Sequence, residues 1–154
     1  MERFRKMDMA IVFISLGSNL GIREQHLIHA KNAIQKDIGT IISESSIYEN
    51  DAVGFDGNPF CNQVIKIETI LSPKDLLQKT QEIEIKMGRT QKTTIKNDMP
   101  VYSNRIIDID ILLYDDLQIN TETLTIPHPK MNEREFVMKP LEEVRSRTHL
   151  TINH

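Results

Sequence analysis

The hydrophobic and polar positions along this chain change their period several times, and each change marks a predicted element. Apolar, β-branched runs predict four strands, and apolar residues at helical spacing predict two helices and a last helical region that is interrupted at Pro140. The predicted strands span residues 10–16, 41–48, 60–68 and 104–113, the helices 22–38 and 73–86, a short edge hairpin 118–126, and the last helical region 132–144.

The first six strands and helices follow the order β-α-β-β-α-β. This order predicts an α+β fold of the ferredoxin-like split βαβ type, with a mainly antiparallel sheet, extra C-terminal elements and αβα layers. Two helices should cover one face of the sheet, and the other face should be free for a site unless the later segments cover it. Local signals agree with the helix boundaries, because Gly39 and Gly88 follow the two helices and Ser72 and Pro73 precede the second.

One predicted strand carries two carboxylates inside an apolar run. Alternation directs Asp108 and Asp110 to one face and Ile107, Ile109 and Ile111 to the other. Two residues of strand rise separate the aspartate Cα atoms by about 6.6 Å. That spacing suits two Mg²⁺ ions, which lie about 3.5–4 Å apart in two-metal sites. The alternative is a half-exposed strand whose aspartates meet solvent or lysine side chains, and this stretch alone leaves both interpretations open.

Another predicted strand places an aromatic ring beside an amide. Alternation puts Phe60, Asn62 and Val64 on one face and Cys61 on the other. A flat, polar heterocycle could stack on Phe60 and hydrogen-bond to Asn62. The alternative is a core phenylalanine beside a solvated asparagine. Cys61 is expected to be an inert core residue.

Composition narrows the classes of function. The 154 residues fit one domain, which we expect to span 10–154 after a disordered leader at 1–9. A net charge of −3 gives no reason to expect a nucleic-acid partner, and no apolar run approaches the ~20 residues needed to cross a bilayer. The single cysteine allows no internal disulfide, so a reducing cytoplasm is the expected location.

A long polar stretch, residues 89–104, separates the second helix from the aspartate strand. Loops of this length in small domains are usually functional or disordered. Arg89 and Arg105 flank the stretch, and arginines on a mobile loop near two aspartates suit a phosphate clamp that closes over a substrate. The alternative is a solvated loop whose basic residues serve solubility.

Four short motifs are spread along the chain. They are the glycine turn 17–21 (GSNLG), the helix end 84–89 (EIKMGR), the strand 105–112 (RIIDIDIL) and the turn 126–129 (IPHP). Taken together, they resemble the motifs of the hydroxymethyl-dihydropterin pyrophosphokinase family of folate biosynthesis. The resemblance covers residues 10–144, nearly the whole chain, and its specific part is the Arg…Asp-x-Asp strand combined with the Pro-His turn.

The resemblance implies transfer of the β,γ-diphosphate of ATP to the hydroxymethyl group of 6-hydroxymethyl-7,8-dihydropterin, with AMP as the second product. Asp108 and Asp110 would bind two Mg²⁺ ions and, with Arg89 and Arg105, form the implied catalytic set. The partners would be the two substrates and adjacent folate-pathway enzymes, and we expect a monomer. The implied pterin-binding residues are Asn50, Asp51, Val53, Gly54, Phe60, Asn62 and Phe136. The implied ATP-binding residues are Leu77, Gln81, Glu84, Lys92, Ile111, Thr125, His128 and Arg134.

The chain departs from the family pattern mainly in the long polar stretch. It has no tryptophan, where the family commonly carries one, and Gln91 stands where a second arginine is common. Ser103 and Asn104 replace a common Gly-Pro, and the segment before them is longer. Tyr102 is a candidate replacement for the missing aromatic contact.

Two other functions fit part of the pattern. A magnesium-dependent nucleotidyltransferase could use the same aspartate pair, but it would not need a pocket of Phe60, Asn62 and Phe136. A non-catalytic ferredoxin-like module that binds a metabolite would not need two aspartates on one strand face opposite a basic loop.

Overall fold

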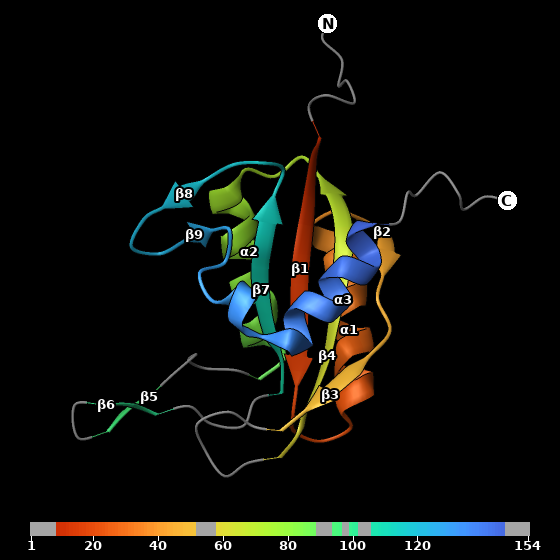
Figure 1. The fold of residues 1–154 in the computed structure, drawn as a ribbon, viewed down its shortest axis with the longest axis vertical. Coiled ribbons are helices and arrows are strands. Elements are labelled where there is room, and N and C mark those ends of the chain that lie inside the picture. The colour runs from red at the N-terminus through yellow and green to blue at the C-terminus, as the bar shows by residue number, and fades with distance from the viewer. Residues whose placement is uncertain (1–8, 52–57, 89–93, 97–98, 102–105, 147–154) are drawn as a thin grey trace, which may run out of the picture.

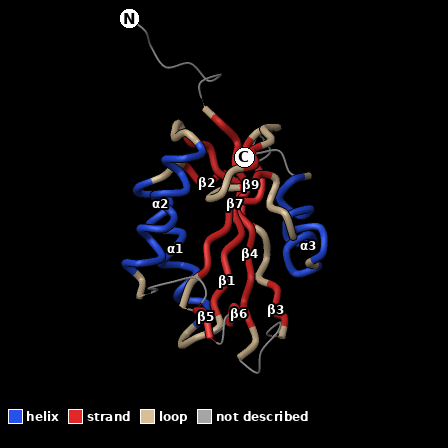
Figure 2. The backbone as a smooth tube through the Cα atoms, turned by 90° about the vertical axis from the view of Figure 1, so that its left-hand side faces the viewer, coloured by secondary structure: helices blue, strands red, loops and turns tan. Residues whose placement is uncertain are grey.

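The computed structural model describes residues 9–51, 58–88, 94–96, 99–101 and 106–146, the two short pieces 94–96 and 99–101 by their backbone alone. One antiparallel sheet runs through the molecule, with helices on both faces (Figures 1 and 2). Nearly all of the expected leader, residues 1–8, lies outside the described residues. The strands of this sheet are β1 (Ala10–Ser18), β2 (Thr40–Glu44), β3 (Tyr48–Asn50), β4 (Phe60–Thr69) and β7 (Asp108–Tyr114). The helices are α1 (Arg23–Asp37), α2 (Pro73–Lys86) and α3 (Glu135–Arg145), with a 3₁₀ turn, η2 (Met131–Glu133), before the last.

The strand order in the sheet is β2-β4-β1-β7, and every neighbouring pair is antiparallel. The long strand β4 pairs with β1 on one side from Cys61 to Thr69. On its other side it pairs with β2 toward its C-terminal end and with β3 toward its N-terminal end. The α+β class and the antiparallel sheet expected from the sequence are therefore confirmed.

The predicted single strand 41–48 is wrong, because the chain forms two strands, β2 and β3, with a break at Ser45. The Ser45 hydroxyl accepts a hydrogen bond of 3.0 Å from the backbone N–H of Val64, and the Ser45 N–H donates to the Val64 carbonyl at 2.9 Å. The Ser45 carbonyl accepts from the side chain of Gln63 at 2.6 Å. A side chain thus replaces part of the backbone ladder, so pairing continues while the strand is interrupted.

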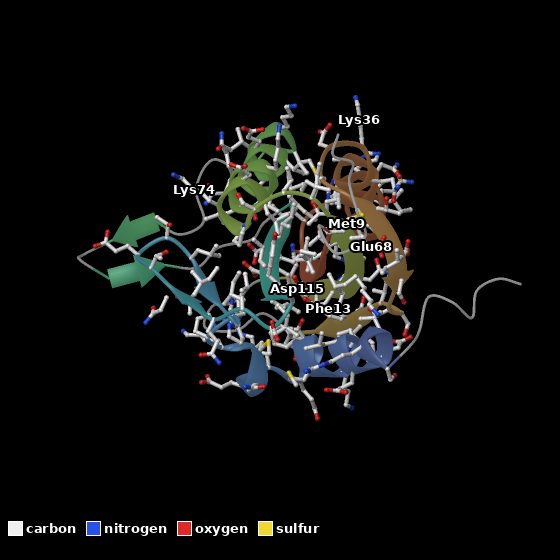
Figure 3. All side chains as sticks on the ribbon, turned by 90° about the horizontal axis from the view of Figure 1, so that it is seen from above. Met9, Phe13, Lys36, Glu68, Lys74 and Asp115 are labelled. Carbon is white, nitrogen blue, oxygen red and sulfur yellow. The ribbon has the colours of Figure 1, made fainter. Side chains whose placement is uncertain are left out.

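Two helices, α1 and α2, cover one face of the sheet, and α3 covers part of the other (Figures 1 and 2). Viewed from the end, the layers separate clearly, with Phe13 on the side of α3 (Figure 3). The core between the sheet and the first two helices includes Val12, Ile14 and Leu16, all fully buried. The second face of the sheet, which we expected to be free for a site unless later segments covered it, is therefore partly covered by α3 (Figures 1 and 2).

A second, smaller core lies under α3. On the sheet it contains Phe13, Val64 and Leu112, and on the helix it contains the stripe Val137, Leu141 and Val144. Burial of one such aliphatic side chain contributes about 1.5–3 kcal/mol. The interruption predicted at Pro140 is wrong, because α3 continues through this buried proline. Proline removes one backbone hydrogen bond, and the packed apolar stripe offsets that loss.

Strand β1 is longer than predicted. Gly17 and Ser18 belong to the strand and not to the following turn, and Gly17 pairs with Asn62 on one side and Asp108 on the other. The chain turns at Gly21, which has φ 68°. Ser72 caps α2 as predicted, with its hydroxyl accepting from the Asp75 N–H at 3.2 Å.

Two small hairpins complete the described fold. The predicted hairpin within 118–126 is confirmed as β8 (Ile119–Asn120) paired with β9 (Thr125–Ile126). The stretch 89–104, expected as a loop, contains a further antiparallel pair, β5 (Thr94–Lys96) and β6 (Met99–Val101). None of the helices in the described ranges is long and apolar enough to cross a bilayer.

Gly39 has a tighter constraint than the sequence indicated. The sequence predicts a glycine that ends a helix, but Gly39 is not among the glycines with positive φ. A Cβ atom at this position would lie 2.2 Å from the backbone carbonyl oxygen of Glu68. Only a residue without a side chain allows this close approach of the helix end to β4.

We expect Gly39→Ala to lower the free energy of unfolding by about 1–3 kcal/mol, because the backbone must move to admit the methyl group. Urea denaturation followed by circular dichroism measures the change. The neighbouring exposed substitution Thr40→Ala is the control and should stay within about 0.5 kcal/mol of the parent. Equal stabilities for the two variants would contradict the close approach.

Candidate functional site

The two aspartates lie side by side on β7, the strand at one edge of the sheet. In the register with β1, Asp110 is opposite Ser15 and Asp108 is opposite Gly17. Both aspartates are half-buried, whereas the isoleucines that alternate with them are in the core against α1 and α2. A carboxylate pair is therefore presented on the sheet face that α3 shares.

A row of three residues crosses the sheet at the end of β1. Asn62 on β4 pairs with Gly17 on β1, and Gly17 pairs with Asp108 on β7. Neighbouring strands are about 4.8 Å apart, so roughly 10 Å separates the Cα atoms of Asn62 and Asp108. A Cβ atom on Gly17 would lie 3.3 Å from Oδ1 of Asn62 and 3.5 Å from Cδ1 of Phe60. The glycine thus lets both side chains lean over β1 toward the aspartate strand.

The amide of Asn62 is held in one orientation. The side chain is 5% exposed, and its Nδ2 donates to the Tyr48 carbonyl at 3.1 Å and, in a short contact, to Oδ1 of Asn50. Asn50 in turn donates through its own Nδ2 to the Asp51 carbonyl at 2.7 Å. With Nδ2 committed to β3, the Asn62 Oδ1 beside Gly17 is the atom available to accept a hydrogen bond from a ligand.

Two aromatic rings lie on this same face. Phe60 begins β4 and is half-buried. Phe136 is in the first turn of α3, is half-buried, and packs against the smaller core. The guanidinium of Arg134 lies 6.0 Å from the centroid of the Phe136 ring, within cation–π range.

The outer edge of β7 gathers a second group of the predicted residues. The N–H of Ile109 donates to Oε2 of Glu84, a buried carboxylate of α2, at 2.7 Å. Farther along the same edge, the N–H of His128 donates to the Leu112 carbonyl at 3.0 Å. Leu77 and Gln81 share α2 with Glu84, and α2 contacts β7.

Thr125 and the Pro-His turn lie beside this edge as well. Thr125 is on β9, which contacts β7, and the Ile126–Pro127 peptide bond is cis. His128 accepts a hydrogen bond at Nδ1 from the Lys130 N–H at 3.2 Å. The side chain of Ile111 is buried in the core between the sheet and the first two helices, with Leu77 packed against the same cluster, so the backbone of Ile111 is the part proposed to meet a ligand at the edge.

The ends of the segment 51–57 are tied to the β1–α1 turn. Asn19 and Asn58 exchange two side-chain-to-backbone hydrogen bonds of 3.0 and 3.1 Å. Arg23 donates to the Pro59 carbonyl at 2.9 Å and pairs with Glu49 at 2.7 Å. These contacts fix where the predicted pterin loop leaves and re-enters the sheet.

Cys61 lies on the opposite face of β4 and is 1% exposed. Burial raises the pKa of its thiol; Arg23 opposes that rise and Glu49 adds to it. The thiol is therefore protonated at neutral pH, as expected for an inert core residue.

Several predicted site residues lie outside the described residues, namely Val53, Gly54, Arg89, Lys92 and Arg105, together with Gln91 and Tyr102. The structure places Ser15 and Gly17 beside the aspartates, and the sequence pattern did not predict this position for either residue. No apolar alternation continues beyond Leu16 in the sequence, because Gly17, Ser18 and Asn19 follow, and these residues have the composition of a turn.

Comparison with known proteins gives a consistent match. The family model of 7,8-dihydro-6-hydroxymethylpterin-pyrophosphokinase (HPPK) matches residues 13–146. A relative in Porphyromonas gingivalis, named 2-amino-4-hydroxy-6-hydroxymethyldihydropteridine pyrophosphokinase, is 42% identical over 143 residues, covering 92% of this chain and 95% of the relative. A Bacillus subtilis relative of the same name is 42% identical over 136 residues, covering 87% and 77%.

A solved structure supports the same fold at greater distance. The crystal structure of Plasmodium falciparum HPPK-DHPS with pteroate superposes with a TM-score of 0.68 at 16% identity, over 88% of this chain. The match spans 39% of the Plasmodium chain, so it concerns one part of that longer protein. Since the family model covers most of the sequence and the curated relatives are well above 30% identical, this chain belongs to the 7,8-dihydro-6-hydroxymethylpterin-pyrophosphokinase family.

Proposed function

We propose that this chain transfers the diphosphate of ATP to the hydroxymethyl group of 6-hydroxymethyl-7,8-dihydropterin and releases AMP. The observation that carries the proposal is the row Asn62–Gly17–Asp108, which sets a fixed amide and a carboxylate pair on one sheet face about 10 Å apart. That separation accommodates a heterocycle at one end and a phosphate chain at the other. Curated relatives across the length of the chain carry the name of this activity.

We also infer that the main sheet with α1 and α2 is a ferredoxin-like split βαβ unit. The four strands β1, β2, β4 and β7 play the parts of its first to fourth strands. The spatial order β2-β4-β1-β7 and the two crossover helices on one face support this assignment. The strand β3 and the helix α3 are then additions, and both contribute to the proposed site.

The pterin would bind between the aromatic rings. Phe60 offers a stacking surface on β4 and Phe136 offers one on α3, both on the face that the aspartates share. The Asn62 Oδ1 would accept from an N–H of the pterin ring, because the Nδ2 of the same amide is already engaged by β3. Asn50, Asp51 and the loop that follows would complete the polar edge.

Asp108 and Asp110 would hold Mg²⁺ where the phosphates bind. Both are half-exposed oxygen donors, and within the part of the chain that the structure describes no third histidine, cysteine or acidic residue joins them in a metal-binding group. Such a pair fits Mg²⁺, which keeps several waters and binds through one or two carboxylates plus substrate phosphates. When bound, two such ions would neutralise phosphate charge and orient the reacting oxygens.

ATP would lie along the outer edge of β7. The adenosine end would meet α2 at Leu77, Gln81 and Glu84, with the backbone of Ile111 and Thr125 nearby. The phosphates would then pass to the aspartate face, where Arg134 and His128 add positive or donating groups. Arg89, Lys92 and Arg105 are proposed as further phosphate contacts from the long stretch.

The chemistry follows from this placement. The pterin hydroxymethyl oxygen forms a bond to the β-phosphorus of ATP, and the bond from that phosphorus to the oxygen bridging to the α-phosphorus breaks. AMP leaves with the bridging oxygen, and the hydroxyl proton passes to solvent. Phosphoryl transfer of this kind depends mainly on positioning and on stabilising charge on phosphate oxygens. The residues of this chain therefore act by aligning two substrates in one row.

We further propose that the protein acts as a monomer in the cytoplasm, with adjacent folate-pathway enzymes as partners. The buried, protonated thiol of Cys61 is compatible with a reducing compartment. The Plasmodium chains carry HPPK together with DHPS in one polypeptide, which supports a partnership between such enzymes.

The nature of the nucleotide product tests the proposal directly. Protein mixed with Mg²⁺, ATP and hydroxymethyl-dihydropterin should form AMP and dihydropterin diphosphate in equal amounts, as measured by ion-exchange chromatography. Removal of Mg²⁺ with a chelator should abolish the product. ADP as the product would indicate a simple kinase, and inorganic pyrophosphate would indicate a nucleotidyltransferase; either outcome overturns the proposal.

Replacing either aspartate tests the metal assignment. Asp108→Asn and Asp110→Asn should each lower kcat/KM by roughly 100-fold or more, because metal electrostatics contribute several kcal/mol to the transition state. The exposed Asp116, which follows β7, provides the control Asp116→Asn, with activity expected at the parent level. Full activity in both site variants would show that neither carboxylate binds the metal.

Phe136→Ala tests the stacking assignment. We expect affinity for the pterin to fall about tenfold, since stacking of a flat ring on an aromatic side chain is worth about 1–3 kcal/mol, while ATP affinity stays within twofold. The matched control is Met138→Ala, since Met138 is on the same helix, half-buried and packed against the same core. A similar loss of pterin affinity in both variants, measured by calorimetry, would attribute the effect to the helix and not to the ring.

A further inference from the structure

The carboxylate of Glu143 joins the far end of α3 to the link between β2 and β3. The Ser46 N–H lies 3.2 Å from each of its oxygens, and the Ser46 hydroxyl lies 2.9 Å from Oε1 and 3.2 Å from Oε2. The Tyr48 hydroxyl lies 3.4 Å from Oε1. The carboxylate accepts from one backbone N–H and two hydroxyls, and hydrogen bonds to a charged group are directional contacts that strengthen as they shorten. The Ser46 hydroxyl, at 2.9 Å, makes the closest of these contacts and the Tyr48 hydroxyl makes the longest.

This link is also fixed to the sheet from the other side. Ser45, the residue before Ser46, exchanges two hydrogen bonds with the backbone of Val64 and accepts one from Gln63. Residues 45–48 are therefore held by β4 within the sheet and by Glu143 from above it. The position of α3 relative to β3 depends on this short connector.

Tyr48 carries the connection on to the amide of the proposed pterin pocket. Its hydroxyl meets Glu143, while its backbone carbonyl accepts the hydrogen bond from Asn62 Nδ2 at 3.1 Å. Tyr48 and Asn62 are direct partners in the β3–β4 register. One residue thus connects the Glu143 carboxylate to the side chain whose orientation selects a ligand N–H.

Glu143 also lies on the same side of α3 as Phe136. Seven residues separate them, which is close to two helical turns, so their side chains leave the helix in nearly the same direction. Phe136 is at the N-terminal end of this side and Glu143 is toward its C-terminal end. A contact that fixes the C-terminal end of α3 through Glu143 therefore also restricts how far Phe136, at the N-terminal end, can move relative to the sheet.

We propose that Glu143 is a positioning residue for the pterin half of the site. Acting through Ser46 and Tyr48, it fixes the distance between the Phe136 ring on α3 and the Asn62 amide on β4. This assignment rests on the proposed function. It predicts a larger effect on the pterin than on ATP. The hydrogen bonds described for this network join α3, the 45–48 link and β4, whereas the adenosine end of ATP is proposed to lie at α2 and the edge of β7. Arg134, at the start of α3, is a proposed phosphate contact that this helix does carry.

The decisive experiment compares Glu143→Ala with Glu142→Ala in the full chain. Glu142 is the next residue of the same helix and pairs at 3.8 Å with Arg145 of that helix, so its removal changes charge equally without touching the connector. Steady-state assays of AMP formation give KM for each substrate. Calorimetry with a non-hydrolysable ATP analogue and Mg²⁺ present gives the pterin Kd.

We expect Glu143→Ala to raise the pterin KM and Kd about tenfold, the effect of losing a hydrogen bond to a charged group, while the ATP KM stays within twofold. Glu142→Ala should leave both within twofold. Glu143→Gln should recover part of the loss, because its amide oxygen still accepts while its NH₂ group faces the Ser46 donors. An equal rise in both KM values, or an unchanged pterin KM, would overturn the inference.

A second variant keeps the test sharp if Glu143→Ala does not fold. Tyr48→Phe removes only the hydroxyl and should raise the pterin KM about threefold, with the ATP KM unchanged and the thermal midpoint within a few degrees. Where Glu143→Ala does fold, the double variant should have the same pterin KM as Glu143→Ala alone, because both changes remove the contact between the Tyr48 hydroxyl and Glu143. Full additivity, or no effect of Tyr48→Phe on the pterin KM, would refute the connection.

The parent protein separates this inference from the proposed function. If the parent forms no AMP from ATP and the pterin, the proposed function fails. If the parent forms AMP and the variants show no selectivity for the pterin, only the role of Glu143 fails.

Discussion

The structure depends on the register in which β1 pairs with its two neighbours. This strand lies between β4 and β7, and its pairing brings Asn62 and Asp108, which are far apart in the sequence, into one row across the sheet. Because side chains alternate with a period of two, a slip of one residue would send the aspartates into the apolar core. The deep burial of Val12, Ile14 and Leu16 prevents that slip. The same contacts that stabilise the sheet therefore also hold the site in alignment.

Strand β7 can serve two halves of a site because it is at an edge. Its aspartate side chains point to the face shared with α3, while its outer backbone meets Glu84 and His128. Half-exposure lowers the cost of carrying two carboxylates in an apolar strand, since full burial of unpaired charge is strongly unfavourable. An inner strand pairs with a neighbouring strand along both edges, so its backbone could not form hydrogen bonds to residues or ligands outside the sheet.

Much of this arrangement could be predicted from the sequence, because it depends on alternation along single strands. The facing of Asp108 and Asp110, and of Asn62, follows from a period of two, and the structure agrees. The points at which strands and helices are interrupted or continue could not be predicted in this way. Ser45 interrupts a strand by a contact with Val64, and Pro140 stays inside a helix because distant residues bury its neighbours. Such tertiary contacts override local propensity and leave no trace in a short window of sequence.

The connector around Glu143 shows the same limit in the site itself. Ser46 and Tyr48 are 97 and 95 residues from Glu143, and no motif spacing predicts that they meet. The need for such a connector has a physical origin. A pocket that uses a ring on α3 and an amide on β4 requires two layers to keep a fixed separation, and an apolar interface alone leaves a helix some freedom to slide and tilt. Hydrogen bonds to a carboxylate are directional, so they remove that freedom where packing does not. A polar contact at the far end of α3 can thus matter for binding at the near end.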